Sequence, residues 1–367
     1  MAHGRGSILA LNAGSSTLKF ALFAQAPGLP VLERGELVDA AAIATLLDRA
    51  DATTPGRVQA VGHRIVHGGA DHVAPVRFTA DVLKTLEDLT PLDPLHMPLC
   101  LEPARIVAAA RPGLTQFACF DTAFHRTLPP VAQRFAIPRA LFEAGVRRYG
   151  FHGLSCEYIA GQLRGQAPAL AAGRVIIAHL GSGASLTALA DGASIANSFG
   201  FGLLDGLMMA TRCGAIDPGV VFHLGRQGHT LAEIEYMLTR RSGLLGVSGI
   251  SGDLRVLLAN DAAPACEAVE LFVYRIALEC GAMASALGGV NGIVFTGGIG
   301  EHAAGIRAMV CARLGWLGVR LDEGANAANA LRIDGEGSTI DVRVIPTDEA
   351  AMIARHVLDL TGGDDLG

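Results

Sequence analysis

The sequence lacks the features of a metal–sulfur, nucleic-acid-binding or membrane protein. Its seven cysteines form no CxxC pair, which argues against a zinc site and a redox dithiol. It has no run of five basic residues, and its net charge of −6 attracts neither nucleic acid nor an anionic membrane. No apolar stretch reaches the ~18–20 residues of a spanning helix, and the N-terminal residues do not resemble a signal peptide. We expect a cytoplasmic protein with no nucleic-acid or membrane partner.

Aromatic and charged residues are also scarce, at 5% and 17% of the chain, whereas half of the residues are hydrophobic. This composition is typical of a compact globular enzyme and argues against extended disorder. The length of 367 residues exceeds the roughly 100–200 residues of an ordinary domain, so two domains are predicted.

One local pattern occurs twice. An apolar run at 8–11, a small-residue turn and a β-prone run at 18–23 predict a hairpin, and residues 175–189 repeat the pattern 168 residues later. A third strand at 292–296 continues into a glycine-rich turn up to Gly300, and a helix is predicted from about Ala303. Such turns let backbone N–H groups approach phosphates, although each turn by itself fits an ordinary hairpin better, and only the recurrence of the pattern favours phosphate binding.

Helical periodicity occurs between these strands, so an α/β class is predicted. The longest helix is rich in Ala and Gly and apolar on most faces, which suggests a core or interdomain helix. The predicted helices cover residues 80–89, 99–110, 155–163, 231–240 and about 265–287.

Two segments of the first half carry residues suited to binding an anion. Arg64 lies in a histidine- and glycine-rich segment, and its guanidinium fork suits a carboxylate or phosphoryl group. Asp121 follows an apolar run, where ligands collect in α/β folds. A surface turn for Arg64 and a capping role for Asp121 are the alternatives.

Three segments of the second half are also candidates. Residues 205–218 predict an apolar helix ending in Arg212, a residue suited to neutralising charge on a phosphoryl group. Asp253 and Arg255 lie in a polar Gly/Ser loop that suits a nucleoside or the capped start of a helix. Glu349 lies in the first turn of a predicted helix, where a carboxylate stabilises the helix dipole or binds magnesium.

In this order, the segments resemble the acetate kinase family, the acetate/propionate kinases of the actin-like ATPase fold. The resemblance extends from Ile8 to His356. It rests on the motifs Asn12-Ala-Gly-Ser-Ser-Thr-Leu-Lys19, Gly62-His-Arg-Ile-Val-His-Gly-Gly69, Phe120-Asp-Thr-Ala-Phe-His125, Arg148-Tyr-Gly-Phe-His-Gly153, His179-Leu-Gly-Ser-Gly-Ala-Ser185, Gly206-Leu-Met-Met-Ala-Thr-Arg212, Gly297-Gly-Ile-Gly-Glu301 and Pro346-Thr-Asp-Glu349.

The resemblance implies a role for each matched position. Asp121 corresponds to the catalytic aspartate, His152 and Arg212 to the transition-state stabilisers, and Arg64 to the clamp on the substrate carboxylate. The other positions form the acyl pocket (Val66, Leu95 and Leu203), the magnesium site (Asn12 and Glu349) and the ATP site (Lys19, His179, Leu180, Gly181, Ser182, Gly183, Asp253, Leu254, Arg255, Gly298, Ile299, Gly300, Glu301 and His302).

The resemblance also implies an architecture and a reaction. We expect two duplicated actin-like (ribonuclease H-like) α/β domains with a nucleotide cleft between them, residues 1–150 with a returning C-terminal helix at 350–367, and residues 151–349. The implied reaction is reversible transfer of the γ-phosphoryl group of ATP to acetate, with Mg²⁺ or Mn²⁺, in a homodimer. A carboxylate is deprotonated near pH 7, so Asp121 is expected to position groups rather than to abstract a proton.

Two alternatives to an acetate kinase remain. Propionate or butyrate kinases differ by one or two methylenes in the pocket, which sequence does not resolve. A non-catalytic ATP switch is compatible with the fold, although a carboxylate clamp has no use in a switch. Four residues depart from the family pattern and concern the acyl pocket or the phosphate loops: Met97, Ser182, Leu203 and His302.

Overall fold

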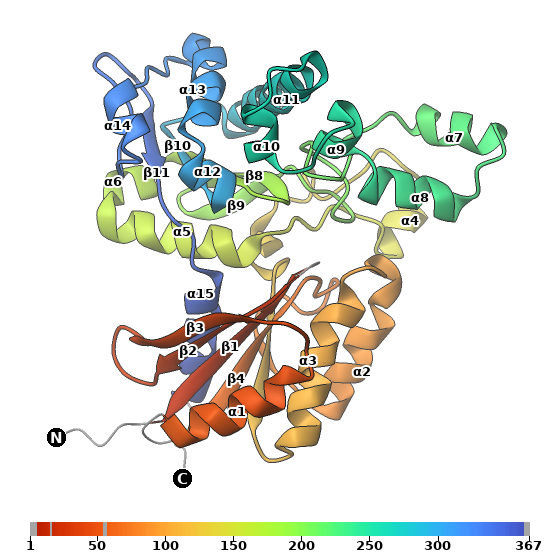
Figure 1. The fold of residues 1–367 in the computed structure, drawn as a ribbon, viewed down its shortest axis with the longest axis vertical. Coiled ribbons are helices and arrows are strands. Elements are labelled where there is room, and N and C mark those ends of the chain that lie inside the picture. The colour runs from red at the N-terminus through yellow and green to blue at the C-terminus, as the bar shows by residue number, and fades with distance from the viewer. Residues whose placement is uncertain (1–5, 15–16, 54–56, 363–367) are drawn as a thin grey trace. The chain divides into compact units, whose positions relative to one another are not determined.

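The structure, a computed structural model, describes residues 6–14, 17–53 and 57–362 (Figure 1). The chain forms two compact units. Unit 1 comprises Met1–Arg126, Phe151–Tyr158 and Asp348–Gly367, and unit 2 comprises Thr127–Gly150 and Ile159–Thr347. The domain boundaries expected at residues 150 and 349 stay a prediction, and the compact units divide the chain differently between residues 127 and 158.

Unit 1 is built on a six-stranded mixed sheet of order β3-β2-β1-β4-β6-β5. β1 pairs with β2 in antiparallel and with β4 in parallel orientation, and β4 pairs in parallel with β6. The carboxyl ends of β1, β4 and β6 therefore meet at one edge of the sheet. The strands are β1 (Ser7–Ala13), β2 (Leu18–Ala24), β3 (Val31–Leu37), β4 (Val58–Ile65), β5 (Val76–Arg77) and β6 (Thr115–Phe120).

Unit 2 repeats this topology in a five-stranded sheet of order β11-β10-β7-β8-β9. β7 pairs antiparallel with β8 and parallel with β10, as β1 pairs with β2 and β4. The predicted duplication is thus confirmed at the level of strand order and direction. The strands are β7 (Arg174–Leu180), β8 (Ala184–Ala190), β9 (Ala193–Asn197), β10 (Gly292–Thr296) and β11 (Asp341–Val344).

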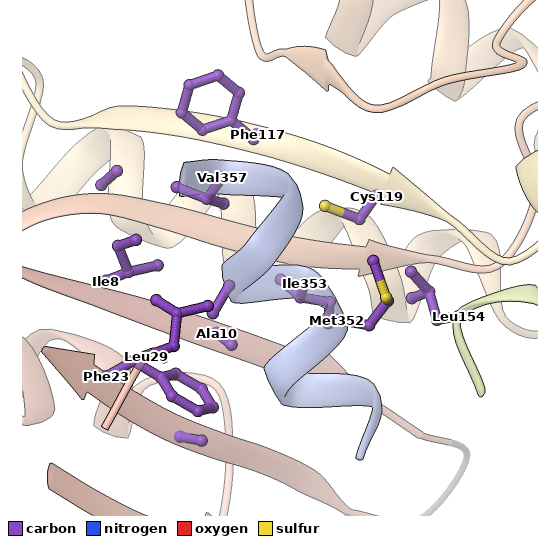
Figure 2. Close-up of a cluster of buried hydrophobic side chains, with 13 residues drawn as sticks. Ile8, Ala10, Phe23, Leu29, Phe117, Cys119, Leu154, Met352, Ile353 and Val357 are labelled. Carbon is purple, nitrogen blue, oxygen red and sulfur yellow. The ribbon is translucent and has the colours of Figure 1, made fainter. Parts of the chain in front are cut away.

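Helices cover both faces of the unit 1 sheet. Successive side chains of β1 point to opposite faces, and both sets are apolar, so each face packs against helices. Ile8 and Ala10 pack against α15 (Glu349–Thr361), as Figure 2 shows. Their neighbours Leu9 and Leu11 pack with residues of α1 (Ala42–Thr53) and α3 (Met97–Ala110) on the opposite face. Gly62 on β4 allows the close approach of α15, because a Cβ atom there would lie 2.4 Å from Ile353 Cγ2.

The five helices predicted from periodicity are all present, with ends shifted by a few residues. No helix among the described residues is both long and apolar enough to cross a membrane. The remaining helices are α2 (Ala80–Asp88), η1 (Thr90–Leu92), η2 (Ala123–Thr127), α4 (Arg139–Glu143), α5 (Gly153–Gln166), α6 (Pro168–Ala171), α7 (Pro218–Arg226), α8 (Leu231–Arg240), α9 (Gly243–Ser248), α10 (Leu254–Leu258), α11 (Ala263–Leu287), α12 (Gly297–His302), α13 (Ala304–Arg313), η3 (Gly315–Leu317) and α14 (Glu323–Ala327).

Two local predictions were wrong. Residues 205–217 form an irregular segment rather than an apolar helix. Gly206 and Gly214 adopt φ values of +80° and +73°, which an L-residue in a helix does not. The residues predicted as a glycine-rich turn after β10 form helix α12, which begins at Gly297, directly after the strand ends.

Candidate functional site

A buried ion pair lies at the carboxyl edge of the unit 1 sheet. Arg64, near the end of β4, donates from Nε and Nη2 to Oδ2 of Asp121 at 3.0 and 2.5 Å. Its Nη1 donates to the carbonyl oxygen of Ala13, at the end of β1, at 3.0 Å. The side chains are 13% and 1% exposed. Arg64 therefore lies on a strand and not in a surface turn, and its charge is aimed at this edge.

The two carboxylate oxygens of Asp121 differ, because Oδ2 accepts from Arg64 and Oδ1 does not. Its Oδ1 is buried and accepts no hydrogen bond from the described residues. The pKa of Asp121 is raised to about 6, chiefly by burial and also by Glu349, while Arg64 opposes the rise. Burial would lower the pKa of Arg64, but Asp121 and Glu349 together raise it above the ordinary value. An unpaired buried oxygen is costly, so Oδ1 is a natural point for a bound cation or ligand.

Glu349, the first residue of α15, lies beside this pair. Its Oε2 accepts a hydrogen bond from Nδ2 of Asn12 on β1 at 2.7 Å. Within the described part of the chain, no three His, Cys, Asp or Glu side chains converge as in a metal site made of protein alone. Carboxylate and amide oxygens near an orphaned carboxylate oxygen nevertheless fit Mg²⁺, which takes one or two carboxylates and completes its shell with water and phosphate oxygens.

His152 lies in a constrained turn next to Asp121. Its φ of +57° is uncommon for a residue with a side chain. The N–H of Gly153 donates to the carbonyl oxygen of Asp121 at 2.9 Å, and a Cβ atom on Gly153 would lie 2.1 Å from that oxygen. His125 pairs through Nε2 with the Phe151 carbonyl at 2.9 Å, and burial lowers its pKa to about 4, so the neutral ring donates. These contacts fix the backbone that carries His152.

The other predicted residues of unit 1 are less tightly placed. Val66 is fully buried just after β4, whereas Leu95 is 36% exposed. Lys19 on β2 lies at the surface, 3.8 Å from Glu36. Ser15 and Ser16 of the first predicted phosphate turn lie outside the described residues. Met97, which departs from the family pattern, is the buried first residue of α3.

The predicted phosphate turn of unit 2 joins β7 to β8. His179 is opposite Ser185 in the hairpin register, and the N–H of Gly181 donates to the carbonyl of Gly183 at 2.9 Å. Leu180 is buried, and Ser182 is exposed at the tip. The turn is narrow and presents backbone rather than bulky side chains.

The second predicted ATP stretch, α12, is held at its N-terminal end by Glu301. Oε1 of Glu301 accepts from the backbone N–H of Gly297 at 2.8 Å and of Thr347 at 3.1 Å. Gly298 is exposed, and a Cβ atom on it would meet nothing within 4 Å, so the backbone is uncovered at Gly298 although Glu301 caps Gly297. His302 is exposed, and its Nε2 lies 3.9 Å from Glu301 Oε2.

Arg307 on α13 holds the other end of α12 and was missed from the sequence. This fully buried side chain donates to the carbonyls of Gly300 and Glu301, both at 2.9 Å. It also donates to Oδ1 and the carbonyl of Asn326 and to Oδ1 of Asn329, at 2.8, 2.7 and 2.6 Å. The only signal in the sequence was an arginine beside the apolar positions of a helix.

Asp253 and Arg255 form the third predicted ATP stretch. Asp253 is the N-cap of α10 and accepts the backbone N–H of Arg255 at 2.9 Å. The two side chains also form an ion pair at 2.6 Å, and Leu254 between them is buried. The capped-helix alternative is therefore confirmed.

Arg212 and Leu203 come together in the irregular segment of unit 2. Nη1 of Arg212 donates to the Leu203 carbonyl at 2.8 Å. Arg148 supports this segment through an ion pair with Asp205 at 3.0 Å and a hydrogen bond to the Ser198 carbonyl at 3.1 Å. The structure thus places the predicted acid, metal and catalytic residues Asn12, Arg64, Asp121, His152 and Glu349 in unit 1, and Arg212, Leu203 and the three ATP stretches of residues 179–183, 253–255 and 298–302 in unit 2.

Comparison with known proteins gives one consistent result. Residues 31–355 match the model of the acetokinase family. The chain is 50% identical to an acetate kinase of Rhodopseudomonas palustris (strain TIE-1), over 97% of this chain and 98% of the relative. It is 34% identical to two solved structures. A Francisella tularensis propionate kinase has a TM-score of 0.90, and the match covers 96% of this chain and 99% of that structure. The Porphyromonas gingivalis acetate kinase has a TM-score of 0.87, and the match covers 97% of this chain and 100% of that structure.

Proposed function

The chain belongs to the acetokinase family, and from this premise we propose how its residues phosphorylate a short-chain carboxylic acid. It is a kinase that converts acetate and ATP to acetyl phosphate and ADP. The predicted family, α/β fold class and kinase activity are confirmed. The observation that carries the residue-level proposal is the Arg64–Asp121 pair, whose orphaned carboxylate oxygen lies near Glu349.

In unit 1, we assign acid binding to Arg64. Its guanidinium already uses one edge for Asp121, and an incoming carboxylate would compete for or share these donors. Asp121 has no proton to remove, because a short-chain acid is ionised near pH 7. Its role is to orient Arg64 and a cation. His152, held in a fixed turn, provides a donor for charge that develops on the phosphoryl group.

In unit 2, we assign nucleotide binding to the narrow turn after β7 and to the exposed backbone at Gly298 near the start of α12. Backbone N–H groups at such turns and helix ends donate hydrogen bonds to phosphate oxygens, so binding does not require a large positive net charge. This fits the overall charge of −6. Arg212, supported by the Leu203 carbonyl, supplies a cation for the equatorial phosphoryl oxygens.

Magnesium is the metal we propose for Asn12, Glu349 and Asp121. Both substrates are anions and repel each other. When bound, Mg²⁺ would reduce this repulsion by neutralising negative charge on the phosphates of ATP. Replacing Glu349 with glutamine is expected to raise the Mg²⁺ concentration for half-maximal rate about tenfold, because a neutral amide binds the ion more weakly. A Mg²⁺ titration at saturating ATP measures this. Glu157→Gln, elsewhere in unit 1, is the control, and an unchanged titration for Glu349→Gln would remove this residue from the site.

Acid choice is proposed to depend on Val66, Leu95 and Leu203. Structural similarity does not separate acetate from propionate, because the solved propionate kinase and acetate kinase are both 34% identical to this chain. Leu203→Ala should enlarge the acyl pocket and raise kcat/KM for butyrate relative to acetate about tenfold, the size expected for one or two methylenes. The Leu203 carbonyl that supports Arg212 is retained in this variant. The neighbouring Leu204→Ala is the control, and equal ratios in both variants would place Leu203 outside the pocket.

We further propose a cytoplasmic homodimer that contacts through α11. All seven cysteines are free thiols, as in a reducing compartment. Tyr274 and Leu278 on α11 are 45% and 51% exposed, and nearby Trp316 is 72% exposed. Leu278→Glu should halve the mass measured by light scattering, because a buried charge opposes association. Leu231→Glu, 80% exposed on α8, is the comparison. Dissociation by that change alone would place the interface on α8.

Acyl phosphate formation tests the function directly. Purified protein with Mg-ATP and acetate, propionate, butyrate or no acid is assayed by hydroxylamine trapping, next to Asp121→Asn. Product that depends on both the acid and Asp121 is expected. ATP binding without product from any acid would favour the alternative of a non-catalytic switch.

A further inference from the structure

A pocket of about 440 Å³ lies wholly within unit 2 and includes none of the residues assigned above. It is formed by the irregular segment that carries Arg212, by the ends of α8 and α9, and by α11. Its volume falls within the range of small-molecule sites, about 300–1,000 Å³. The residues that define its chemistry are Met208, Cys213, Met237, Arg241, Leu271 and Arg275.

The charge of this pocket is positive. Arg241 and Arg275 both line it, and no acidic side chain does so among the described residues. Arg275 donates one Nη2 hydrogen bond to the Ala215 carbonyl at 3.3 Å and lies near Glu279, whereas no side-chain partner of Arg241 is found in the described part of the chain. Two guanidinium groups suit a carboxylate or phosphate group, which each can bind through paired N–H donors.

Apart from Ser242, the rest of the lining is largely apolar. Met208 is 3% exposed, and Met237 and Leu271 are partly buried. Methionine side chains adapt to ligands of different shape. The pocket therefore suits a small molecule with an anionic head and a short aliphatic body better than it suits inorganic phosphate.

The walls of the pocket are hydrogen-bonded to the segment before Arg212. The N–H groups of Ser242, Leu244 and Leu245 donate to the carbonyls of residues 211, 209 and 210, at 3.0, 2.9 and 3.0 Å. A Cβ atom on Gly243, at φ +64°, would lie 2.2 Å from the Met209 carbonyl, so the two segments are in tight contact. A ligand that moves the start of α9 must displace this backbone too.

We propose that this pocket is a regulatory site for a small amphiphilic anion, a carboxylate or phosphate monoester with a short apolar body, which alters turnover by shifting the segment that carries Arg212. The proposal that such an anion binds depends only on the residues that line the pocket. Its effect on rate rests on the role proposed for Arg212.

Labelling of Cys213 measures binding without requiring activity. Cys213 is one of the residues that line the pocket, and Cys266→Ser removes the exposed competing thiol. The probes are n-butyl phosphate and hexanoate, with 1-butanol as the uncharged comparison, and alkylation of Cys213 by N-ethylmaleimide is followed by peptide mass spectrometry. Both anions are expected to slow labelling at least about fivefold at ~10 mM, and 1-butanol is not.

Matched variants then locate the site. Arg241→Gln/Arg275→Gln should abolish protection, whereas Arg240→Gln, an exposed neighbour on α8 outside the pocket, should retain it. The probes should also change kcat at least about twofold in the parent and in Arg240→Gln but not in the double variant.

Three outcomes would contradict the proposed binding site or its role. If the probes do not protect Cys213 in the parent, or if protection persists in the double variant, the proposed binding site is wrong. Labelling that varies with protein concentration and not with the probes would show that a second copy covers the pocket, which also overturns it. Protection without a rate effect would overturn only the regulatory part.

Discussion

Replacing Arg64 with alanine is expected to lower kcat/KM for acetate by about 10³-fold while changing KM for ATP by less than about threefold. The Arg64 guanidinium lies at the carboxyl edge of the unit 1 sheet and is 13% exposed, so an acid bound there loses a fork-shaped donor. The three predicted nucleotide stretches, residues 179–183, 253–255 and 298–302, all belong to unit 2. Initial rates with each substrate varied separately give the two constants.

The Arg64–Asp121 pair complicates the interpretation of that variant. Arg64→Ala leaves Asp121, 1% exposed, without its partner, and breaking a buried pair costs about 3–5 kcal/mol of folding stability. Some lost activity would then reflect a disturbed fold. Adding Asp121→Asn removes the uncompensated charge, so the double variant should regain much of the stability measured by urea unfolding.

Acetate binding separates the two effects. In the Asp121→Asn background, Arg64→Ala should still abolish acetate binding detected by saturation-transfer NMR, because the clamp acts on the substrate and not only on Asp121. Arg64→Lys keeps the positive charge but not the fork-shaped pair of donors, so its acetate binding should be intermediate between that of Arg64 and that of Arg64→Ala. Arg111→Ala, which breaks a more exposed pair with Asp48, is the control in the same unit. Equal losses of acid and ATP affinity would count against the clamp.

Arg307→Met is expected to raise KM for ATP at least about tenfold and to leave KM for acetate unchanged. The guanidinium donates to five acceptors and fixes the C-terminal end of α12, whose opposite end we assign to phosphate. Methionine fills a similar volume but leaves buried carbonyl oxygens unpaired, which costs about 1–3 kcal/mol for each. We therefore also expect a marked fall in the urea midpoint of unit 2.

Arg313→Met is the matched control for this prediction. Arg313 lies on the same helix, but it is 39% exposed and pairs with Glu270 at 3.2 Å. An exposed pair contributes little, about 0–1 kcal/mol, so KM for ATP should not change. If Arg307→Met lowers stability and raises the KM values for ATP and acetate together, then Arg307 supports the fold in general and does not position α12.

The local elements of this protein were largely predictable. The two hairpins, at 8–23 and 175–189, follow from apolar strands joined by small-residue turns, and the α/β class follows from the helices between the strands. Residues 205–218 misled the prediction because an apolar sequence without a turn signal at its centre imitates a helix. Their irregular path depends on backbone bonds to α9, which lies outside any local window.

The sequence by itself determined the duplicated strand pattern, the motifs of the family and the residue types of the site, since each depends on short-range order along the chain. Only the tertiary structure decided which of these residues meet. Arg64 pairs with Asp121 across 57 residues and Asn12 with Glu349 across 337. These contacts exist because β1, β4 and β6 are parallel neighbours whose carboxyl ends share one edge and because α15 returns to that sheet. The burial of Arg307 has the same origin, since its acceptors come from α12 and the α14 region, and no local periodicity encodes that packing.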